Sequence, residues 1–544
     1  MKGFQIHVKK GRVKIQSFIQ SHHFDNDVFE DEDLSFGIEG VLLNKKQIEK
    51  NTPPTQHYLQ YLYQTHPLDA IKQLEGEIVG YIFDQQQKKL SVFTNFTGTR
   101  KCFYYASENE VIIDTDLPRL VKTLKANHIP YTVDEFAMYS LLVCGNTLEN
   151  HTPIQQIKKL CDAEILQLDI TSNQLEIHSY HQPLPSFQGT KEEALHRINE
   201  IFIEATKLEF DKDLELHLPS FALLSGGLDS RMTLINAIQE GYSIAKAFCF
   251  SQKGYWDEVL AEKIAKDYQT PFHFVSLNGG EYIIAVDDIF QKSHGLVSYT
   301  SAAHTNYAYQ YIPCHSYGLI HSGQLGDGIL GSFNKHPFPH PPTSEKIVVM
   351  PRLFHRMKAQ FQEIIQSYDR EELFLMRNVG YNRAVIGSYM AESLDSYQTS
   401  PFMHSEFIRF AQSLPEDWKY QQKIYIDWIN TYQKNATQYI WERTLLKPTS
   451  HIKTWIGDKL MKRFFRIWKT KVTRDIERSN MTAYDYYFER NIQLQQEANQ
   501  YFEENIQRVN FPTLKEDMIL QFTHGSFTEK AAVLTVLSNF KHYF

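Results

Sequence analysis

Residues 221–238 combine an apolar run, two glycines and a carboxylate in an order that could bind phosphate. The segment Phe221-Ala-Leu-Leu-Ser-Gly-Gly-Leu-Asp-Ser230 begins with four apolar residues typical of a buried strand, and helical spacing of apolar residues follows it. Gly226 and Gly227 permit close approach of the backbone, and free N–H groups at the helix start can bind a phosphate. The loop has no lysine, so the cationic partner is a metal ion or a distant residue, and Asp229 is the expected magnesium ligand.

A second glycine-rich loop carries another acid. The segment Gly318-Leu-Ile-His-Ser-Gly-Gln-Leu-Gly-Asp-Gly-Ile-Leu-Gly-Ser-Phe333 again has an apolar strand before the turn. We expect its Asp327 to emerge at the same sheet edge as Asp229, where two carboxylates facing one phosphate chain would supply oxygen ligands for magnesium. Taken alone, each loop has a simpler interpretation: an ordinary turn for the first, and a solvated acid in a flexible turn for Asp327.

Alternating strands and helices around these loops predict a parallel sheet. After the first strand and helix we expect a strand at 244–250, a helix at 255–268 and a strand at 271–277. Short repeats of this kind are typical of a parallel sheet with helices on both faces. In such sheets, ligands bind beyond the carboxyl ends of the strands, near a switch in strand order.

The two loops resemble those of the asparagine synthetase family, whose members adenylate a carboxylate with ATP and release pyrophosphate. The first loop is similar to the family's pyrophosphatase loop. In the second, Ser322, Gly323, Asp327 and Gly331 match the family pattern Ser-Gly-Glu-Gly-(Ala/Ser)-Asp-Glu-(Leu/Val)-Phe-Gly-Gly-Tyr, but Gln324 stands where asparagine-forming members carry Glu. An amide cannot accept a proton as a carboxylate does, so Gln324 indicates another acceptor or a different base.

The resemblance implies a site for ATP and Mg²⁺. Asp229 and Asp327 would bind the metal, and Gln324 and Lys447 would act in catalysis. Lys447 is chosen because family members place a lysine in a comparable Arg-x-x-Lys context, where it steadies charge on the leaving pyrophosphate; Arg443 is the second candidate, and a surface lysine is the alternative. The backbone of Cys249, near the end of the second strand, is expected to contact the adenine. The expected nucleotide and pyrophosphate contacts are Leu224, Ser225, Gly226, Gly227, Asp229, Ser230, Cys249, Ser322 and Gly323.

Residues 1–185 alternate short strands with few helices and resemble the family's glutaminase domain. The pieces that carry this resemblance are Gly40-Val-Leu-Leu-Asn44, Leu74-Glu-Gly-Glu-Ile-Val-Gly-Tyr-Ile-Phe-Asp84, Thr97-Gly-Thr-Arg-Lys-Cys-Phe-Tyr-Tyr105 and Thr152-Pro-Ile. Glutaminases of this class use an N-terminal cysteine whose own amine is the base, whereas the first Ser, Thr or Cys here is Ser17. The amide-binding motif is altered as well, to Glu39-Gly-Val-Leu-Leu-Asn44, so we expect an inactive glutaminase.

A chain of 544 residues is too long for one ordinary core. We therefore predict an α/β protein with three parts: an Ntn-hydrolase-like αββα sandwich over 1–185, a PP-loop ATP pyrophosphatase domain with a parallel sheet over 190–450, and a helical extension over 451–544. Within the extension, residues 454–476 predict a basic amphipathic helix. Such helices usually pack on one face of a globular enzyme, although they can also lie on an anionic membrane.

Composition excludes some classes of partner. A formal net charge of −8 argues against nucleic acid, because phosphate backbones demand a basic surface. No apolar run is long enough to span a bilayer, and the first residues lack a signal-peptide core. The five cysteines have no Cys-x-x-Cys pair and are typical of reduced thiols, so a cytoplasmic location without a membrane partner is expected.

The leading hypothesis is an ATP-dependent carboxylate–amine ligase that forms an acyl-adenylate, releases pyrophosphate and then makes an amide bond without its own glutaminase activity. This resembles β-lactam synthetases and macrolactam cyclases. Its partners would be a small-molecule or peptide carboxylate and an amine acceptor, and a homodimer is left open. The alternatives are an asparagine synthase that uses aspartate, ATP and ammonia or glutamine, and a nucleotide-binding pseudoenzyme scaffold.

Overall fold

A computed structural model describes residues 2–20, 24–66, 69–181, 183–461 and 480–544 of the chain. The chain divides into two units. The first contains residues 1–140 and 146–182 with Tyr543, and the second contains residues 141–145 and 183–542 with Phe544.

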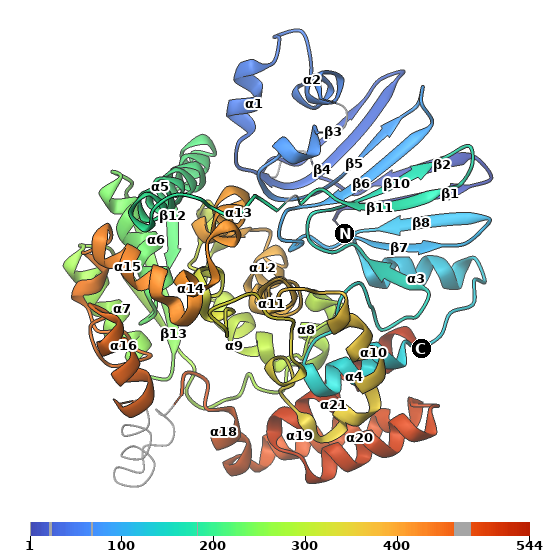
Figure 1. The fold of residues 1–544 in the computed structure, drawn as a ribbon. Helices are drawn as coiled ribbons and strands as arrows, with labels where there is room; N and C mark the ends of the chain where they lie inside the picture. Colours follow the sequence, from blue (N-terminus) through green and yellow to red (C-terminus); the bar gives the residue numbers. More distant parts are fainter. Residues whose placement is uncertain (1, 21–23, 67–68, 182, 462–479) are drawn as a thin grey trace. The chain divides into compact units, whose positions relative to one another are not determined.

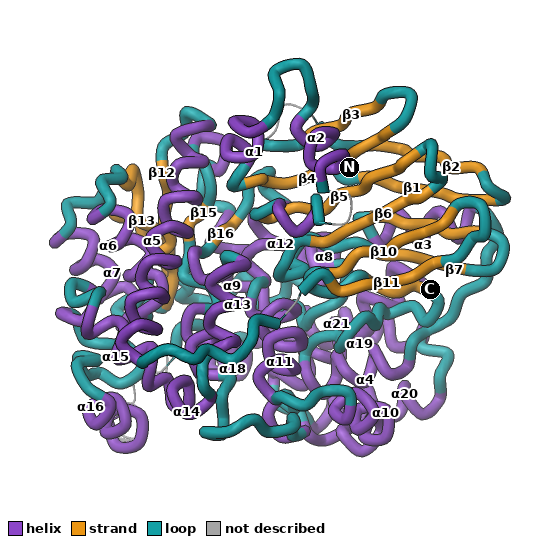
Figure 2. Tube along the Cα trace, turned by 45° about the horizontal axis from the view of Figure 1, so that its top comes forward, coloured by secondary structure: helices purple, strands orange, loops and turns teal. Residues whose placement is uncertain are grey.

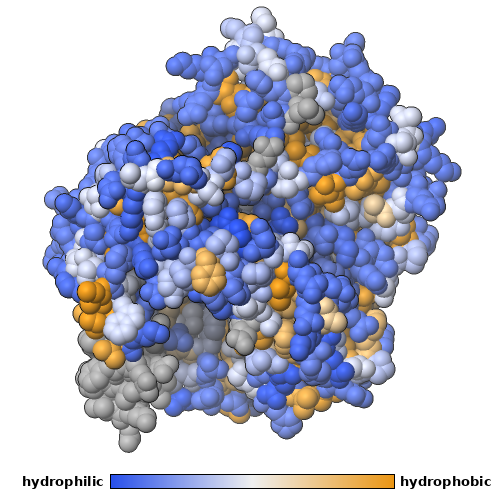
Figure 3. Space-filling view, in the orientation of Figure 1, coloured by the Kyte–Doolittle hydropathy of each residue, from blue (hydrophilic) through white to orange (hydrophobic). Residues whose placement is uncertain are grey.

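The surface in Figure 3 is mainly hydrophilic, with separate small apolar patches between the polar side chains. Among the described residues, none of the helices combines the length and the apolar character that a membrane crossing requires.

The first unit contains two antiparallel sheets (Figure 1). One has five strands in the order β2-β1-β8-β7-β9, and the other has six in the order β11-β10-β6-β5-β4-β3. The strands are β1 (Phe4–Lys9), β2 (Arg12–Ser17), β3 (Asp27–Glu30), β4 (Leu34–Leu42), β5 (Gly76–Asp84), β6 (Lys89–Thr94), β7 (Phe103–Ala106), β8 (Glu110–Asp114), β9 (Ile157–Lys159), β10 (Glu164–Asp169) and β11 (Leu175–Ser179).

The two sheets pack face to face between layers of helices. Ile6 of β1 and Val79 of β5 belong to one buried cluster between the sheets. On the six-stranded sheet, Phe36 of β4 packs with Leu59 and Leu62 of α2. The helices of this unit are α1 (Lys45–Asn51), α2 (Tyr58–Thr65) and α3 (Leu117–Ala126), with α4 (Glu135–Cys144) at its boundary, and α3 packs on β7 and β8. This order of layers confirms the predicted αββα sandwich.

The second unit is built on a five-stranded parallel sheet in the order β14-β13-β12-β15-β16. Figure 2 labels β12, β13, β15 and β16 of this sheet. Strand order reverses at β12, which lies between β13 and β15, so the ligand-binding switch point falls at the ends of these strands. The strands are β12 (Ser220–Leu223), β13 (Ile244–Ser251), β14 (Phe272–Ser276), β15 (Ile320–His321) and β16 (Gln398–Thr399). This confirms the predicted parallel sheet, and the expected strands at 244–250 and 271–277 match β13 and β14.

Helices form most of the remainder of the second unit. Helix α7 matches the helix expected at 255–268, and α6 follows the first glycine loop. The helices are α5 (Lys191–Glu215), α6 (Leu228–Gln239), α7 (Trp256–Asp267), α8 (Val286–Ser293), α9 (Thr300–Tyr309), α10 (Phe354–Gln366), α11 (Glu371–Leu375), α12 (Ile386–Glu392), α13 (Ser405–Ser413), α14 (Glu416–Lys419), α15 (Lys423–Thr431), α16 (His451–Ile456), α18 (Tyr484–Arg490), α19 (Ile492–Asn505), α20 (Pro512–His524) and α21 (Phe527–Tyr543). Most of the amphipathic helix expected at 454–476 lies outside the described residues.

A buried charge cluster ties β15 to α5. His321 lies between Asp213, at 2.7 Å from Nε2, and Glu209, at 3.2 Å from Nδ1. Burial alone would lower the pKa of His321, but the charges and hydrogen bonds of Asp213 and Glu209 raise it to about 9. The imidazolium therefore holds the two-residue strand against the helix, directly before the second glycine loop.

The second loop needs glycine at position 331. Gly331 has a φ of +123°, and a Cβ placed there would lie 2.0 Å from the backbone oxygen of Lys419. The loop that carries Asp327 thus packs backbone against backbone on the end of α14 and on Gln422, directly before α15.

We expect Gly331→Ala to lower the melting temperature more than Gly241→Ala. Both glycines have positive φ, so alanine is strained at both by about 1–2 kcal/mol. At Gly241 no atom lies within 4 Å of the added Cβ, whereas at Gly331 the backbone of Lys419 must move, which adds roughly 1–3 kcal/mol. Equal shifts of the two variants in scanning calorimetry would contradict this packing.

Candidate functional site

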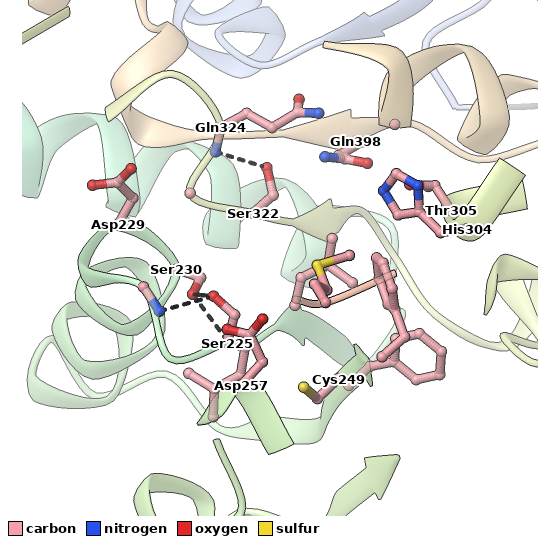
Figure 4. A pocket seen from close by; sticks show the side chains of 18 of the residues that line it. Ser225, Asp229, Ser230, Cys249, Asp257, His304, Thr305, Ser322, Gln324 and Gln398 are labelled. Carbon is pink, nitrogen blue, oxygen red and sulfur yellow. Dashed lines mark hydrogen bonds between the residues drawn. The ribbon is translucent and has the colours of Figure 1, made fainter. Parts of the chain in front are cut away.

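A cavity of about 320 Å³ opens at the carboxyl ends of β12, β13 and β15 (Figure 4). Both glycine loops and the end of β13 line it, so the structure brings together most of the residues predicted to bind nucleotide. The predicted residues that line the cavity are Leu224, Ser225, Gly227, Asp229, Ser230, Cys249, Ser322, Gly323 and Gln324.

The first loop presents the start of α6 to the cavity. Gly227 is the N-cap residue and supplies no side-chain cap. Ser225 Oγ accepts from Gly227 N at 3.2 Å and lies 3.0 Å from Ser230 Oγ (Figure 4). An uncapped helix start with two hydroxyl groups beside it is suited to a phosphate.

Gly226 is not among the described residues that line the cavity; it joins the first loop to the start of α7. Its N–H donates to Asp257 Oδ1 at 2.8 Å, which gives a structural role to one of the two acids at the start of α7. A Cβ at Gly226 would lie 2.7 Å from Glu442 Cβ, so this position requires glycine for close packing.

Arg231 fixes the carbonyl side of the same loop. Its fully buried guanidinium donates to the carbonyl oxygens of Gly226, Gly227, Ala436 and Ile440. Burial lowers the pKa of Arg231 to about 10, against the opposing effect of nearby acids. Sequence reasoning missed this residue, although an arginine directly before the apolar residues Met232, Leu234 and Ile235 was a usable signal.

The two predicted metal ligands meet at the mouth of the second loop. The backbone N–H of Asp327 donates to Asp229 Oδ2 at 3.1 Å, and the hydroxyl of Tyr425 donates to Asp229 Oδ1. Removal from water and then the negative charge of Asp327 raise the pKa of Asp229 to about 8, although the hydrogen bond from Tyr425 lowers it. A cation bound to both carboxylates would reduce the repulsion between them.

The donor set fits Mg²⁺ that is shared with phosphate rather than a cage made of protein alone. The described residues hold no group of three or more His, Cys, Asp or Glu side chains arranged for a metal. Magnesium is commonly bound by one or two carboxylates together with substrate phosphates and water. Asp229 and Asp327 supply two such carboxylates.

The far side of the cavity is neutral. Burial lowers the pKa of His304 to about 4. Its Nδ1 lies 2.9 Å from the Tyr484 hydroxyl, which itself donates to the Thr300 carbonyl at 3.1 Å. Nδ1 therefore carries the hydrogen, and Nε2 keeps a lone pair. Gln324 and Gln398 line the same region, and the Oε1 atom of Gln324 is buried without a hydrogen-bond partner in the described part of the chain (Figure 4).

The predicted catalytic lysine does not reach this cavity. Lys447 is exposed and is absent from the described residues that line it. Arg443, the second candidate, forms a two-point ion pair with Asp458 at 2.9 Å and donates to Gln422 at 2.8 Å. Neither residue lines this cavity in the described part of the chain, and their catalytic role stays a prediction.

We expect Asp229→Asn to raise the melting temperature of the metal-free protein at pH 8 and to lose this advantage toward pH 4. The folded pKa of about 8 lies above the value of 3.8 taken for the free side chain, so the folded protein keeps a proton that the unfolded chain has released. The wild type consequently loses stability as the pH rises through this window, whereas asparagine does not titrate. Thermal melts in EDTA at several pH values check this, and a difference that is independent of pH would refute it.

Residues 210–379 match the family model described as asparagine synthase, and this span contains both glycine loops. The match supports an ATP-dependent ligase of that general type. Comparison with curated proteins yielded no significant match.

Among solved structures, the chain is similar to glutamine phosphoribosylpyrophosphate amidotransferase from B. subtilis complexed with ADP and GMP, at 10% identity and a TM-score of 0.22 over 50% of this chain. A structure described as the allosteric regulatory enzyme of purine biosynthesis is similar at 9% identity and a TM-score of 0.23, also over 50% of this chain. The chain spans 59% of the length of each. These likenesses are too weak to carry an inference.

Proposed function

We propose that the protein is an ATP-dependent carboxylate–amine ligase of the asparagine synthase type. The carboxylate is adenylated, pyrophosphate leaves, and an amine then takes the acyl group from AMP. The observation that carries this proposal is the contact between Asp229 and Asp327 beside an uncapped helix start. The family match over both loops supports the same reaction class.

The first loop binds the phosphate chain of ATP in this proposal. The N–H groups at the start of α6 and the hydroxyl groups of Ser225 and Ser230 face the cavity. Arg231 holds the loop carbonyls on the opposite side, so the donors stay directed toward the ligand. The end of β13, with Cys249, takes the adenosine.

Asp229 and Asp327 would hold Mg²⁺, which when bound neutralises charge on the phosphates. Tyr425 orients Asp229 through its hydroxyl group. A carboxylate oxygen of the substrate then forms a bond to the α-phosphorus, and the bond from that phosphorus to the bridging oxygen of the β-phosphate breaks. Pyrophosphate takes the electron pair.

The amine step needs a proton acceptor, and Gln324 cannot provide one. We assign this role to His304, whose neutral imidazole lines the cavity with Nε2 unprotonated. The amine forms a bond to the acyl carbon, the bond to AMP breaks, and the proton passes from the amine nitrogen to Nε2. The unpartnered amide oxygen of Gln324 is available to accept a second N–H of the amine.

The cavity lining separates this proposal from asparagine formation. Aspartate would bring a second carboxylate, yet no lysine or arginine is present among the described lining residues. The carboxylate substrate is therefore a small molecule or peptide without a second anionic group in this cavity. The proposal includes a cytoplasmic location and leaves a homodimer open.

The first unit supports a ligase without its own glutaminase. Glu39, at the position of the altered amide-binding motif, is buried and forms an ion pair of 3.0 Å with buried Arg100. Glu77 accepts a hydrogen bond from the Thr99 hydroxyl. In this region Glu39 and Glu77 are thus engaged by other residues of the chain, and we propose that the amine comes from solution or from a second substrate.

We expect Asp229→Ala to abolish ATP–pyrophosphate exchange that depends on a carboxylic substrate, because one of two metal ligands is lost. The exposed Asp369→Ala variant is the matched control and should exchange like the wild type. Asparagine made from aspartate and ammonium would favour the first alternative. ATP binding in calorimetry without exchange for any carboxylate tested would favour a pseudoenzyme.

We expect His304→Gln to slow amide formation by roughly 100-fold while ATP–pyrophosphate exchange is retained, because only the second step needs the proton acceptor. The exposed His315→Gln variant is the control. Equal losses in both half-reactions would mean that His304 serves nucleotide binding or folding instead.

A further inference from the structure

A second cavity of about 340 Å³ lies in the second unit, formed by different residues from the first. We call it the basic pocket. Its lining residues are Gly331, Ser332, Asn334, Lys335, Tyr420, Gln421, Gln422, Lys423, Arg443, His451, Thr454, Trp455, Asp458 and Lys459.

Positive charge dominates the basic pocket. Lys335, Lys423, Lys459 and Arg443 face one acid, Asp458, which is already paired with Arg443. None of the three lysines forms an ion pair with a carboxylate in the part of the chain that the structure describes. Burial and then repulsion from Lys346 and Arg443 lower the pKa of Lys335, so these cations share one field. An anion would relieve that repulsion.

Gln422 adds a buried donor that has no partner. The residue is 3% exposed, and its Nε2 atom makes no hydrogen bond to any of the described residues. Its Oε1 accepts from Arg443 at 2.8 Å, and because arginine can only donate, this contact fixes which end of the amide is the N–H₂ group. An unsatisfied buried donor in a basic cavity calls for an acceptor from a ligand.

The backbone at the basic pocket also favours an anion. Gln421 and Gln422 both have a φ of +58°, and α15 begins directly after them without a side-chain cap. The positive end of a nine-residue helix therefore borders the basic pocket. Together with the orphan Nε2 atom, it favours a compact anion with several oxygens.

Three segments that line the basic pocket are connected to the two glycine loops of the nucleotide cavity. Lys335 lies in the loop that follows Asp327, α15 carries both Lys423 and the Tyr425 that bonds Asp229, and Glu442, next to Arg443, donates its N–H to the Gly226 carbonyl at 3.3 Å. The basic pocket is thus linked to the nucleotide cavity through α15, the second glycine loop and the segment that contacts Gly226.

We propose that the basic pocket is a second site that binds a phosphate-type anion outside the nucleotide cavity. Pyrophosphate leaving the neighbouring site is the first source, and this part rests on the proposed function. A phosphate group carried by another small molecule is the second source, with the same chemistry of recognition.

The test is calorimetric titration of the full-length protein with inorganic pyrophosphate and, separately, with inorganic phosphate, in EDTA and without ATP. Gln422→Glu keeps the acceptor for Arg443 but replaces the Nε2 donor by a charged oxygen, so pyrophosphate affinity should fall by roughly tenfold or more. Lys335→Ala should weaken binding and reduce its dependence on salt.

The matched controls are the exposed Gln438→Glu and Lys358→Ala, which change the same charges outside the basic pocket and should bind like the wild type. Phosphate binding that is lost in Gln422→Glu, with pyrophosphate unaffected, would support the site with the second source. Unchanged affinities in both pocket variants, or no binding of either anion by the wild type, would overturn it. The titration contains no ATP, so its result does not depend on whether ATP–pyrophosphate exchange is observed. Thermal melts verify that the variants fold.

Discussion

Two acidic loops meet at the carboxyl edge of the parallel sheet, and the arrangement of the second unit depends on that contact. A backbone N–H of one loop bonds the carboxylate of the other, although the side chains of Asp229 and Asp327 repel each other. Such repulsion persists only when the surrounding fold enforces it. Tyr425 and the start of α6 hold Asp229 in this position. A cation bound to the two carboxylates would reduce their repulsion.

A buried cluster of opposite charges stabilises strand β15 of the parallel sheet. Strand β15 has two residues and can contribute few ladder hydrogen bonds, yet it positions the second glycine loop. The ion pairs of the His321 imidazolium with Asp213 and Glu209 hold this strand in addition to its few ladder hydrogen bonds. Ser322 Oγ adds a hydrogen bond of 2.8 Å to the Thr399 carbonyl. Buried ion pairs are weak evidence for stability but can specify position.

Local patterns were enough to predict both glycine loops, β13 and α7, because glycine turns and apolar periodicity are properties of neighbouring residues. Contacts between distant segments were not visible in that way. Tyr425 lies 196 positions from Asp229 and sits in an apolar helix where a tyrosine resembles ordinary core. The side chain of Lys447 was assigned from a motif with altered spacing, and the turn closed by Trp441 and Leu446 leaves it exposed.

The same limit applies to Arg231 and to the basic pocket. Arg231 contacts carbonyls of the 436–440 segment more than 200 positions away, and Gln422 acquires its orphan donor only because Arg443 occupies the other end of its amide. Residue types alone gave neither result. Geometry was needed to show which polar atoms are satisfied and which are not.

Arg231 also bears on the thermodynamics of ligand capture. By bonding the carbonyls of the first loop, it immobilises that backbone while the chain folds, before any nucleotide arrives. A loop that is already ordered loses little conformational entropy on association, so more of the intrinsic contact energy appears as affinity. Glycine loses more backbone entropy than other residues when it is ordered, and the buried guanidinium orders the two glycines of this loop during folding.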